Sequence, residues 1–223
     1  MSILYIVATP IGNLNDFSAR AIDTLRSVDL ILCEDTRTSK KLLDYYGIET
    51  PTLSYHQHSG SEKTDRIVRL LREDKKLALV SDAGTPGISD PGNKLIASVV
   101  ESNARVRVIP IPGASALTAA ASLSGFPTDR FLFMGFPPVR KKRKKFFEEV
   151  ANSKYPIIFY ESPHRIIKTL KELSIIDKEL KAVVCRELSK KFETIYRGTI
   201  VQVIKNLEGD KIKGEFVVVV NKK

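Results

Sequence analysis

The stretch "KLALVSDAGTPGISDPGNKLIASVV", residues 76–100, changes character twice along its length. It starts as a short apolar run that predicts a buried strand, and it ends as a helical pattern with a proline at its start. The loop between them, residues 81–92, contains three of the chain's 12 glycines and two of its 11 prolines. So many turn-forming residues make either a plain connector or a backbone cradle for a ligand.

The same alternation of apolar strands and helical segments runs through the first half of the chain. Strands are expected at 3–10, 29–35, 52–58, 76–82 and 105–111. Helices are expected at 17–28, 38–47, 61–74 and 91–102. Continuous apolar strands that alternate with helices predict a parallel sheet that helices cover on both faces.

The second half of the chain is less regular. Strands are expected at 130–136, 156–162, 180–188, 194–200 and 214–221. Helices are expected at 116–123, 141–152 and 164–173, followed by one that runs through Leu207. We therefore expect two α/β domains, residues 1–113 and 114–223.

The composition is that of an ordinary soluble globular protein, with 43% hydrophobic and 28% charged residues. Lys and Arg number 36 against 26 Asp and Glu, and this net charge of +10 fits either a nucleic-acid partner or a basic enzyme. Cys33 and Cys185 lie in apolar runs, as buried cysteines in a reducing compartment do. The start lacks a signal-peptide pattern, and three prolines in the uncharged stretch 108–128 argue against a membrane helix, so a cytoplasmic protein is expected.

Turn-rich segments follow four of the five strands expected in the first domain. Ligands of parallel α/β sheets bind beyond the carboxyl ends of the strands, so these segments predict a shared pocket built from backbone amides and carbonyls. The alternative is that they only turn the chain. The sequence contains no G-x-G-x-x-G and no G-x-x-x-x-G-K-[ST] motif, which argues against a Rossmann dinucleotide site and a P-loop. The four segments are 9–13, 33–37, 81–92 and 110–116.

Six motifs, in order along nearly the whole chain, resemble the signature of the ribosomal RNA small subunit methyltransferase I family. That family belongs to the tetrapyrrole methylase superfamily of S-adenosylmethionine (SAM) enzymes. The resemblance implies 2′-O-methylation of a cytidine ribose in the decoding region of 16S rRNA, with the small ribosomal subunit as partner. It also implies a homodimer and two α/β domains, with a parallel sheet in the first, a mixed sheet in the second and SAM in the cleft between them. The motifs are "VATPIGNLND" (7–16), "CEDTRTSKKLL" (33–43), "SDAGTPGISDPG" (81–92), "PIPGASA" (110–116), "GFPP" (135–138) and "YESPHR" (160–165).

The resemblance also implies which residues contact SAM. Because SAM carries no phosphate, its site needs carbonyls, small side chains and apolar walls, which loops of this composition supply. Two positions depart from the pattern: Thr85 replaces an acidic residue common in tetrapyrrole-modifying relatives, and Glu161 stands where some relatives have Met. The implied contacts are Pro10, Ala83, Gly84, Thr85, Ile88, Ser115, Ala116, Glu161 and Leu188.

Methyl transfer to a ribose hydroxyl is an in-line displacement that needs no metal but benefits from a base. The motif "CEDTR" places Glu34 and Asp35 beside Arg37 at the end of a predicted strand. Adjacent strand residues face opposite ways, so at most one of the two carboxylates points toward the site. An equally weighted alternative is that Asp35 caps the following helix. His56, His58, Glu161 and Glu187 are further candidates for the base.

His56 and His58, two residues apart, favour RNA contact over a metal site, because the chain has three histidines and no cysteine cluster. Arg37, Arg165 and Arg186 could each hold a phosphate or the carboxylate of SAM. The alternative for each arginine is a solvated ion pair.

A run of six basic residues stands at the start of the helix expected at 141–152 and precedes an aromatic pair. Cations at a helix N-terminus oppose the helix dipole, so the run favours a role in binding rRNA phosphates. The alternative is a solvated surface run without a partner. The residues are Arg140, Lys141, Lys142, Arg143, Lys144 and Lys145.

Three functions remain open at this point. The first is a SAM-dependent rRNA ribose methyltransferase, and the second is a methylase of the same fold that acts on a small tetrapyrrole. The third is an RNA-binding assembly factor that has lost catalysis. The basic run argues against the second function, because an acidic small substrate would hardly require it.

Overall fold

The computed structural model describes residues 2–102 and 105–222. The chain divides into two compact units, residues 1–115 and 116–223. In the part of the chain that is described, no helix combines the length and the apolar character needed to cross a membrane. Each unit is an α/β structure with its own five-stranded sheet.

The sheet of the first unit is entirely parallel, as the continuous apolar strands predict. Its order is β3-β2-β4-β1-β5, so the first strand lies inside the sheet between β4 and β5. All carboxyl ends therefore lie at one edge. The strands are β1 (Ser2–Val7), β2 (Leu30–Cys33), β3 (Thr52–Ser54), β4 (Lys76–Val80) and β5 (Val106–Ile111).

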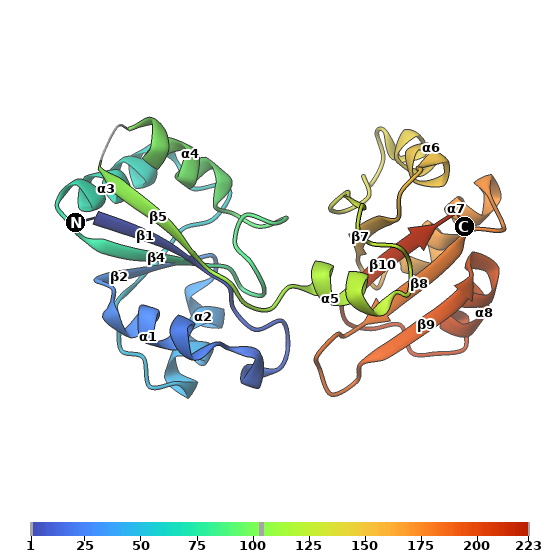
Figure 1. Ribbon diagram of the computed structural model, residues 1–223, viewed down its shortest axis with the longest axis horizontal. Coiled ribbons are helices and arrows are strands. Elements are labelled where there is room, and N and C mark those ends of the chain that lie inside the picture. Colours follow the sequence, from blue (N-terminus) through green and yellow to red (C-terminus); the bar gives the residue numbers. More distant parts are fainter. Residues whose placement is uncertain (1, 103–104, 223) are drawn as a thin grey trace. The chain divides into compact units, whose positions relative to one another are not determined.

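Helices cover both faces of this sheet (Figure 1). Alternate residues of β2 and β4 face opposite sides: Ile31 and Ala78 pack with α1 and α2, whereas Leu32 and Leu79 pack with α3 and α4. The apolar strands thus supply two separate cores, which is why the strand pattern is continuous rather than alternating. The helices are α1 (Ala19–Ser27), α2 (Thr36–Tyr45), α3 (Ser61–Arg72) and α4 (Asn93–Glu101), and a short 3-10 helix, η1 (Leu14–Asp16), precedes α1.

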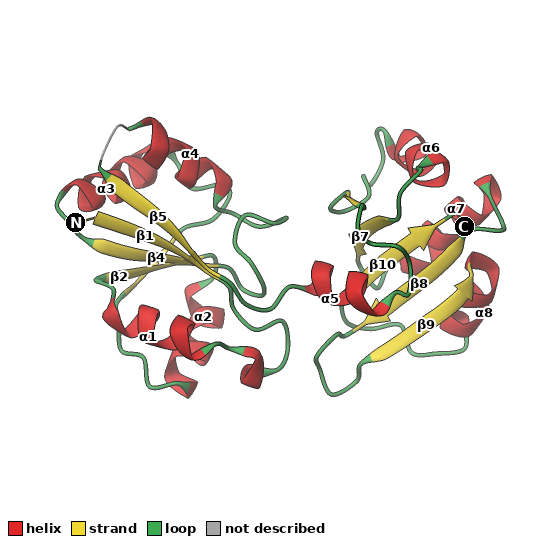
Figure 2. Ribbon diagram, in the orientation of Figure 1, coloured by secondary structure: helices red, strands yellow, loops and turns green. Residues whose placement is uncertain are grey.

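The sheet of the second unit is mixed, in the order β6-β7-β10-β8-β9 (Figure 2). Only β6 and β7 are parallel, and the other neighbours run antiparallel. The strands are β6 (Leu132–Phe133), β7 (Ile157–Glu161), β8 (Lys181–Arg186), β9 (Thr194–Thr199) and β10 (Phe216–Asn221).

Three helices bury one face of this mixed sheet, and a fourth packs on β10 and β7. The main core joins α6 (Arg143–Asn152), α7 (Ile166–Ile176) and α8 (Ile200–Glu208) to alternate residues of the strands, such as Phe159 and Val218. The small-residue helix α5 (Ala116–Leu123) contacts β10 and β7. No α5 residue belongs to the main core, so α5 packs on the other face of the sheet.

The strand expected at 130–136 is much shorter than predicted. It forms ladder pairs only at Leu132 and Phe133. The chain then stays beside β7, with the Met134 amide donating to the Ile158 carbonyl at 2.9 Å, until Gly135 adopts a φ of +61°. A left-handed glycine cannot continue a strand, and this accounts for its early end.

Candidate functional site

The loops after β1, β4 and β5 meet at Gly84. Thr9 and Gly84 exchange backbone hydrogen bonds, with the Thr9 amide donating at 2.9 Å and the Gly84 amide at 3.1 Å. The Thr9 hydroxyl donates to the Ser81 carbonyl at 3.2 Å. A Cβ atom on Gly84 would lie 3.4 Å from Cγ2 of Ile11 and 3.8 Å from the carbonyl oxygen of Ala114. Three turn-rich segments of the sequence are thereby brought to one point at the carboxyl edge of the sheet.

The residues at this point suit SAM better than a phosphorylated cofactor. They offer backbone carbonyls, small side chains and the Ile11 side chain. The segments 9–11, 81–88 and 111–115 contain no Lys or Arg. A phosphate would require cations or a nest of amides, whereas a sulfonium compound with an adenosine and an amino-acid tail does not.

Most of the predicted SAM contacts lie on these loops of the first unit. Pro10 and Gly84 are buried, Thr85 is half-buried, and Ala83 and Ile88 are exposed. Ile88 is 43% exposed. Ser115, which ends the first unit, and Ala116, which begins α5, are both half-buried. Their contacts with SAM stay predictions.

Asp35 caps helix α2. Its carboxylate accepts the Arg37 amide at 2.8 Å and the Arg37 guanidinium at 3.1 Å and 2.7 Å. Hydrogen bonds from Arg37 lower the pKa of Asp35 to about 2. The strand alternation considered above does not apply to this residue, because β2 ends at Cys33. The capping alternative is therefore the one that the structure adopts.

Glu34 has a different environment from its neighbour. Its side chain is half-buried, and burial, followed by the nearby charge of Asp82, raises its pKa. Burial also raises the pKa of Asp90 to about 6, with the charge of Glu34 adding to the effect. A carboxylate that binds a proton more readily is the better general base near neutral pH, so Glu34 suits that role better than Asp35 does.

Sequence reasoning did not single out Asp82 and Asp90. Asp82 accepts the Asp35 amide at 3.1 Å, which ties the β4 loop to the start of α2. The sequence feature that could have indicated Asp82 and Asp90 is their position in the turn-rich loop after β4. Because β4 lies next to β2 in the sheet, that loop lies next to the loop that carries Glu34 and Asp35.

His56 and His58 lie near each other on the loop after β3. Their ring centroids are 6.3 Å apart, and the His58 amide donates to Nδ1 of His56 at 3.2 Å. Among residues 2–102 and 105–222, no three His, Cys, Asp or Glu side chains are grouped as metal ligands would be. The contact of His56 and His58 with RNA stays a prediction.

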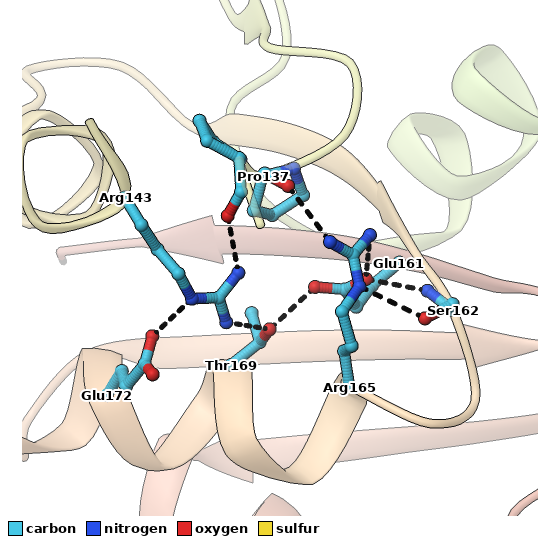
Figure 3. A network of polar contacts seen from close by, with 8 residues as sticks. Pro137, Arg143, Glu161, Ser162, Arg165, Thr169 and Glu172 are labelled. Atoms are coloured by element: carbon cyan, nitrogen blue, oxygen red, sulfur yellow. Dashed lines mark hydrogen bonds and ion pairs between the residues drawn. The ribbon is translucent and has the colours of Figure 1, made fainter. Parts of the chain in front are cut away.

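Glu161, the last residue of β7, is the centre of a polar network in the second unit (Figure 3). Its carboxylate contacts the Arg165 guanidinium at 2.8 Å and accepts the Ser162 amide at 2.7 Å and the Thr169 hydroxyl at 2.6 Å. The Glu161 side chain is fully buried, so these partners supply the hydrogen bonds that water would otherwise donate to its carboxylate. Leu188, the other predicted SAM contact of this unit, is buried as well.

Arg143 differs from the rest of the basic run. The residue is 8% exposed, and its guanidinium donates to Glu172, the Pro138 carbonyl and Thr169 at 2.7, 2.9 and 2.8 Å (Figure 3). It also stacks over the Phe147 ring, 4.7 Å from the centroid. The expectation that all six basic residues face RNA is wrong for Arg143, because its donors are used inside the unit. The exposed members are Arg140, Lys141, Lys142, Lys144 and Lys145.

The three other arginines considered as anion ligands all form ion pairs. Arg37 pairs with Asp35, Arg165 with Glu161, and Arg186 with Asp210 at 3.2 Å. The solvated ion pair that was the alternative is found for Arg37, whereas the pairs of Arg165 and Arg186 involve largely buried side chains.

A family model described as tetrapyrrole (corrin/porphyrin) methylases matches residues 3–204. The ribosomal RNA small subunit methyltransferase I of Synechocystis sp. is 47% identical over 222 residues, which is 99% of this chain and 79% of that protein. The protein of the same name from Thermotoga maritima is 41% identical over 223 residues, the full length of both chains.

Solved structures show the same fold at low identity. A diphthine synthase matches with a TM-score of 0.75 and 15% identity over 99% of this chain and 90% of that one. A cobalt precorrin-4 methyltransferase matches with a TM-score of 0.71 and 18% identity over 98% of this chain and 94% of that one. The expected pair of α/β domains with a parallel and a mixed sheet is confirmed. The chain therefore belongs to the tetrapyrrole (corrin/porphyrin) methylase family and, within it, to the ribosomal RNA small subunit methyltransferase I proteins.

Proposed function

We propose that the protein transfers a methyl group from SAM to the 2′-oxygen of a cytidine ribose in the decoding region of 16S rRNA. The observation that carries this proposal is the meeting of three carbonyl-rich, cation-free loops at Gly84 in a chain of this family. The names of its 41–47% identical relatives support RNA as the substrate. On the same resemblance, we propose that it acts on the small ribosomal subunit in the cytoplasm as a homodimer.

SAM, when bound, supplies an electrophilic methyl group on its sulfonium, so the protein has to hold the acceptor oxygen in line with that methyl. Glu34 is proposed to accept the proton of the ribose hydroxyl. Asp35 and Arg37 are proposed to position it, because their bidentate pair fixes the first turn of α2 beside Glu34.

The test is transfer of labelled methyl from SAM to 30S subunits from a strain that lacks this modification. Nuclease digestion and mass spectrometry are expected to find 2′-O-methylcytidine as the labelled nucleoside. A label on a base, or no label on RNA despite SAM binding, would show that the proposed reaction is wrong. Transfer to a tetrapyrrole instead would support the small-substrate alternative.

Glu34→Gln is expected to lower kcat by about 100-fold or more and to leave the Kd for SAM unchanged, since general-base removal acts on the chemical step. Asp35→Asn is the matched variant and is expected to have a smaller effect, because Asp35 has a pKa of about 2 and acts through Arg37. Single-turnover rates at saturating SAM provide the measurement. A wild-type rate in Glu34→Gln would remove this carboxylate from the mechanism.

The exposed part of the basic run is proposed to bind RNA phosphates, with Phe136, 53% exposed, available for base stacking beside it. Replacing Arg140, Lys142 and Lys144 together by Ala is expected to weaken 30S binding. The slope of log K against log salt should fall by about 2, at about 0.7 for each lost phosphate contact. SAM affinity should not change.

The matched control for this triple variant removes three lysines that are also exposed, elsewhere on the same unit: Lys178, Lys205 and Lys211. It changes the net charge equally and should keep the wild-type salt slope. If the two triple variants have equal slopes of log K against log salt, the basic run is a solvated surface that does not bind RNA.

A further inference from the structure

A cavity of about 480 Å³ lies in the first unit among the loop after β3 and the starts of α3 and α4. Its wall includes Tyr55, His56, Asp65, Asp90 and Lys94. The volume is within the range of about 300–1,000 Å³ that small-molecule sites occupy. The SAM contacts and the base proposed above are not among the residues that line it.

Two helices begin at this cavity without a side-chain cap. Gly60 is the N-cap of α3 and Gly92 the N-cap of α4, and neither helix has a side-chain hydrogen bond at that end. In the same unit, Ser18 and Asp35 cap α1 and α2 with their side chains. The first amides of α3 and α4 therefore stay available to an anion.

Tyr55 supplies an independent indication of a ligand. Only 4% of the residue is exposed, and its ring packs with Leu32, Ile67 and Leu95 in the core under α3 and α4. Its hydroxyl has no hydrogen-bond partner among the residues that the structure describes. In that part of the chain, Oγ of Ser39 is the one fully buried side-chain oxygen or nitrogen without a partner, so the Tyr55 hydroxyl reaches the surface, and Tyr55 lines this cavity. A nearly buried phenol normally has a partner, and a ligand could provide it.

The charges around the cavity discriminate among ligands. The helix N-termini, Lys94 and His56 favour an anion and disfavour a metal cation. Asp65 and Asp90 disfavour a bare anion but accept hydrogen bonds from hydroxyl groups. A ligand that carries both a phosphate and a free hydroxyl satisfies both sets, and a ribose phosphate unit of RNA, with its 2′-hydroxyl, is such a group.

We propose that this cavity holds one ribose phosphate unit of the RNA strand. Its phosphate lies on the first amides of α3 and α4 and on Lys94, and its 2′-hydroxyl donates to Asp65 or Asp90 and accepts from the Tyr55 hydroxyl. The identity of the ligand as RNA rests on the function proposed above. The role is to position the strand, so the site acts on RNA affinity and not on the methyl-transfer step.

The test uses the double variant Tyr55→Phe, Lys94→Gln. It removes the Tyr55 hydroxyl, which has no hydrogen-bond partner among the described residues, and it removes the positive charge of Lys94. Its KM for 30S subunits is expected to rise about tenfold, with kcat and the Kd for SAM unchanged. The matched control, Tyr45→Phe with Lys40→Gln, changes two exposed residues of α2 and should leave KM unchanged. A KM within twofold of wild type in the double variant would overturn the proposal.

Titration with cytidine 5′-monophosphate separates this proposal from the proposed function. The backbone amide signals of residues 61–63 and 93–95 are expected to shift in the NMR spectrum of the wild type and not in that of the double variant. Absence of these shifts, or equal shifts with the same concentration of inorganic phosphate, would overturn the nucleotide site. Shifts as expected, in a protein that methylates no RNA, would support the site and overturn the function.

Discussion

Glu161→Ala is expected to lower the free energy of unfolding of the second unit by about 3 kcal/mol. The carboxylate is fully buried, and its removal leaves Nη2 of Arg165 and the Thr169 hydroxyl without their acceptor, while Arg165 keeps its bonds to Ser162 and the Pro137 carbonyl. Breaking a buried ion pair by deleting one partner costs about 3–5 kcal/mol. The Arg165 side chain is 24% exposed, and partial hydration places the expected value at the lower end.

Urea unfolding followed with a probe in the second unit measures this effect. Glu148→Ala is the control, because Glu148 forms only a surface pair with Lys144 at 3.8 Å and its loss should cost under about 0.5 kcal/mol. A loss below about 1 kcal/mol in Glu161→Ala would mean that the network contributes little to stability.

Glu161 is also a predicted SAM contact. The variant Glu161→Gln separates its role in the stability of the second unit from a role in SAM binding. Glutamine keeps the size and the acceptor oxygen but loses the charge that pairs with Arg165. If this variant unfolds more easily yet binds SAM with the wild-type Kd, Glu161 acts in the fold. A weaker Kd in a folded protein would support the contact that the resemblance implies.

The strands and helices of the first unit could be predicted because their signals are local. Apolar runs of four to six residues, such as β4, separate cleanly from helices with apolar residues at helical spacing. The turn-rich loops then predict their own meeting point, since parallel strands end at one edge. Three of the four segments, 9–13, 81–92 and 110–116, meet at Gly84, and the pocket itself stays a prediction.

Two features could not be predicted because they depend on tertiary contacts. Nothing in a run of six basic residues distinguishes Arg143, which is buried only because Glu172, Thr169 and Phe147 lie opposite it. The cavity at Tyr55 likewise requires that the starts of α3 and α4, some 30 residues apart in sequence, lie together.

Gly84→Val is expected to weaken SAM binding by about 100-fold. The glycine has a φ of +82°, and its backbone is held in place by two hydrogen bonds to Thr9. An added side chain would begin 3.4 Å from Ile11 and 3.8 Å from the Ala114 carbonyl, at the point where the three loops meet. The Cβ itself would make ordinary contacts, so the expected loss comes from the two γ-carbons of Val, which would occupy the space proposed for the cofactor. A 100-fold loss of affinity corresponds to about 3 kcal/mol of binding free energy.

Backbone strain alone could also weaken binding, and Gly47→Val controls for it. Gly47 has a φ of +60° in the same unit, directly after α2, and a Cβ there would meet nothing within 4 Å. Both variants carry the strain of a β-branched residue in the left-handed region, about 1–3 kcal/mol each, so their melting temperatures should fall by similar amounts. Only Gly84→Val should lose SAM in calorimetric titration. If the folded variant binds SAM as the wild type does, the loops at Gly84 are connectors and the cofactor binds elsewhere.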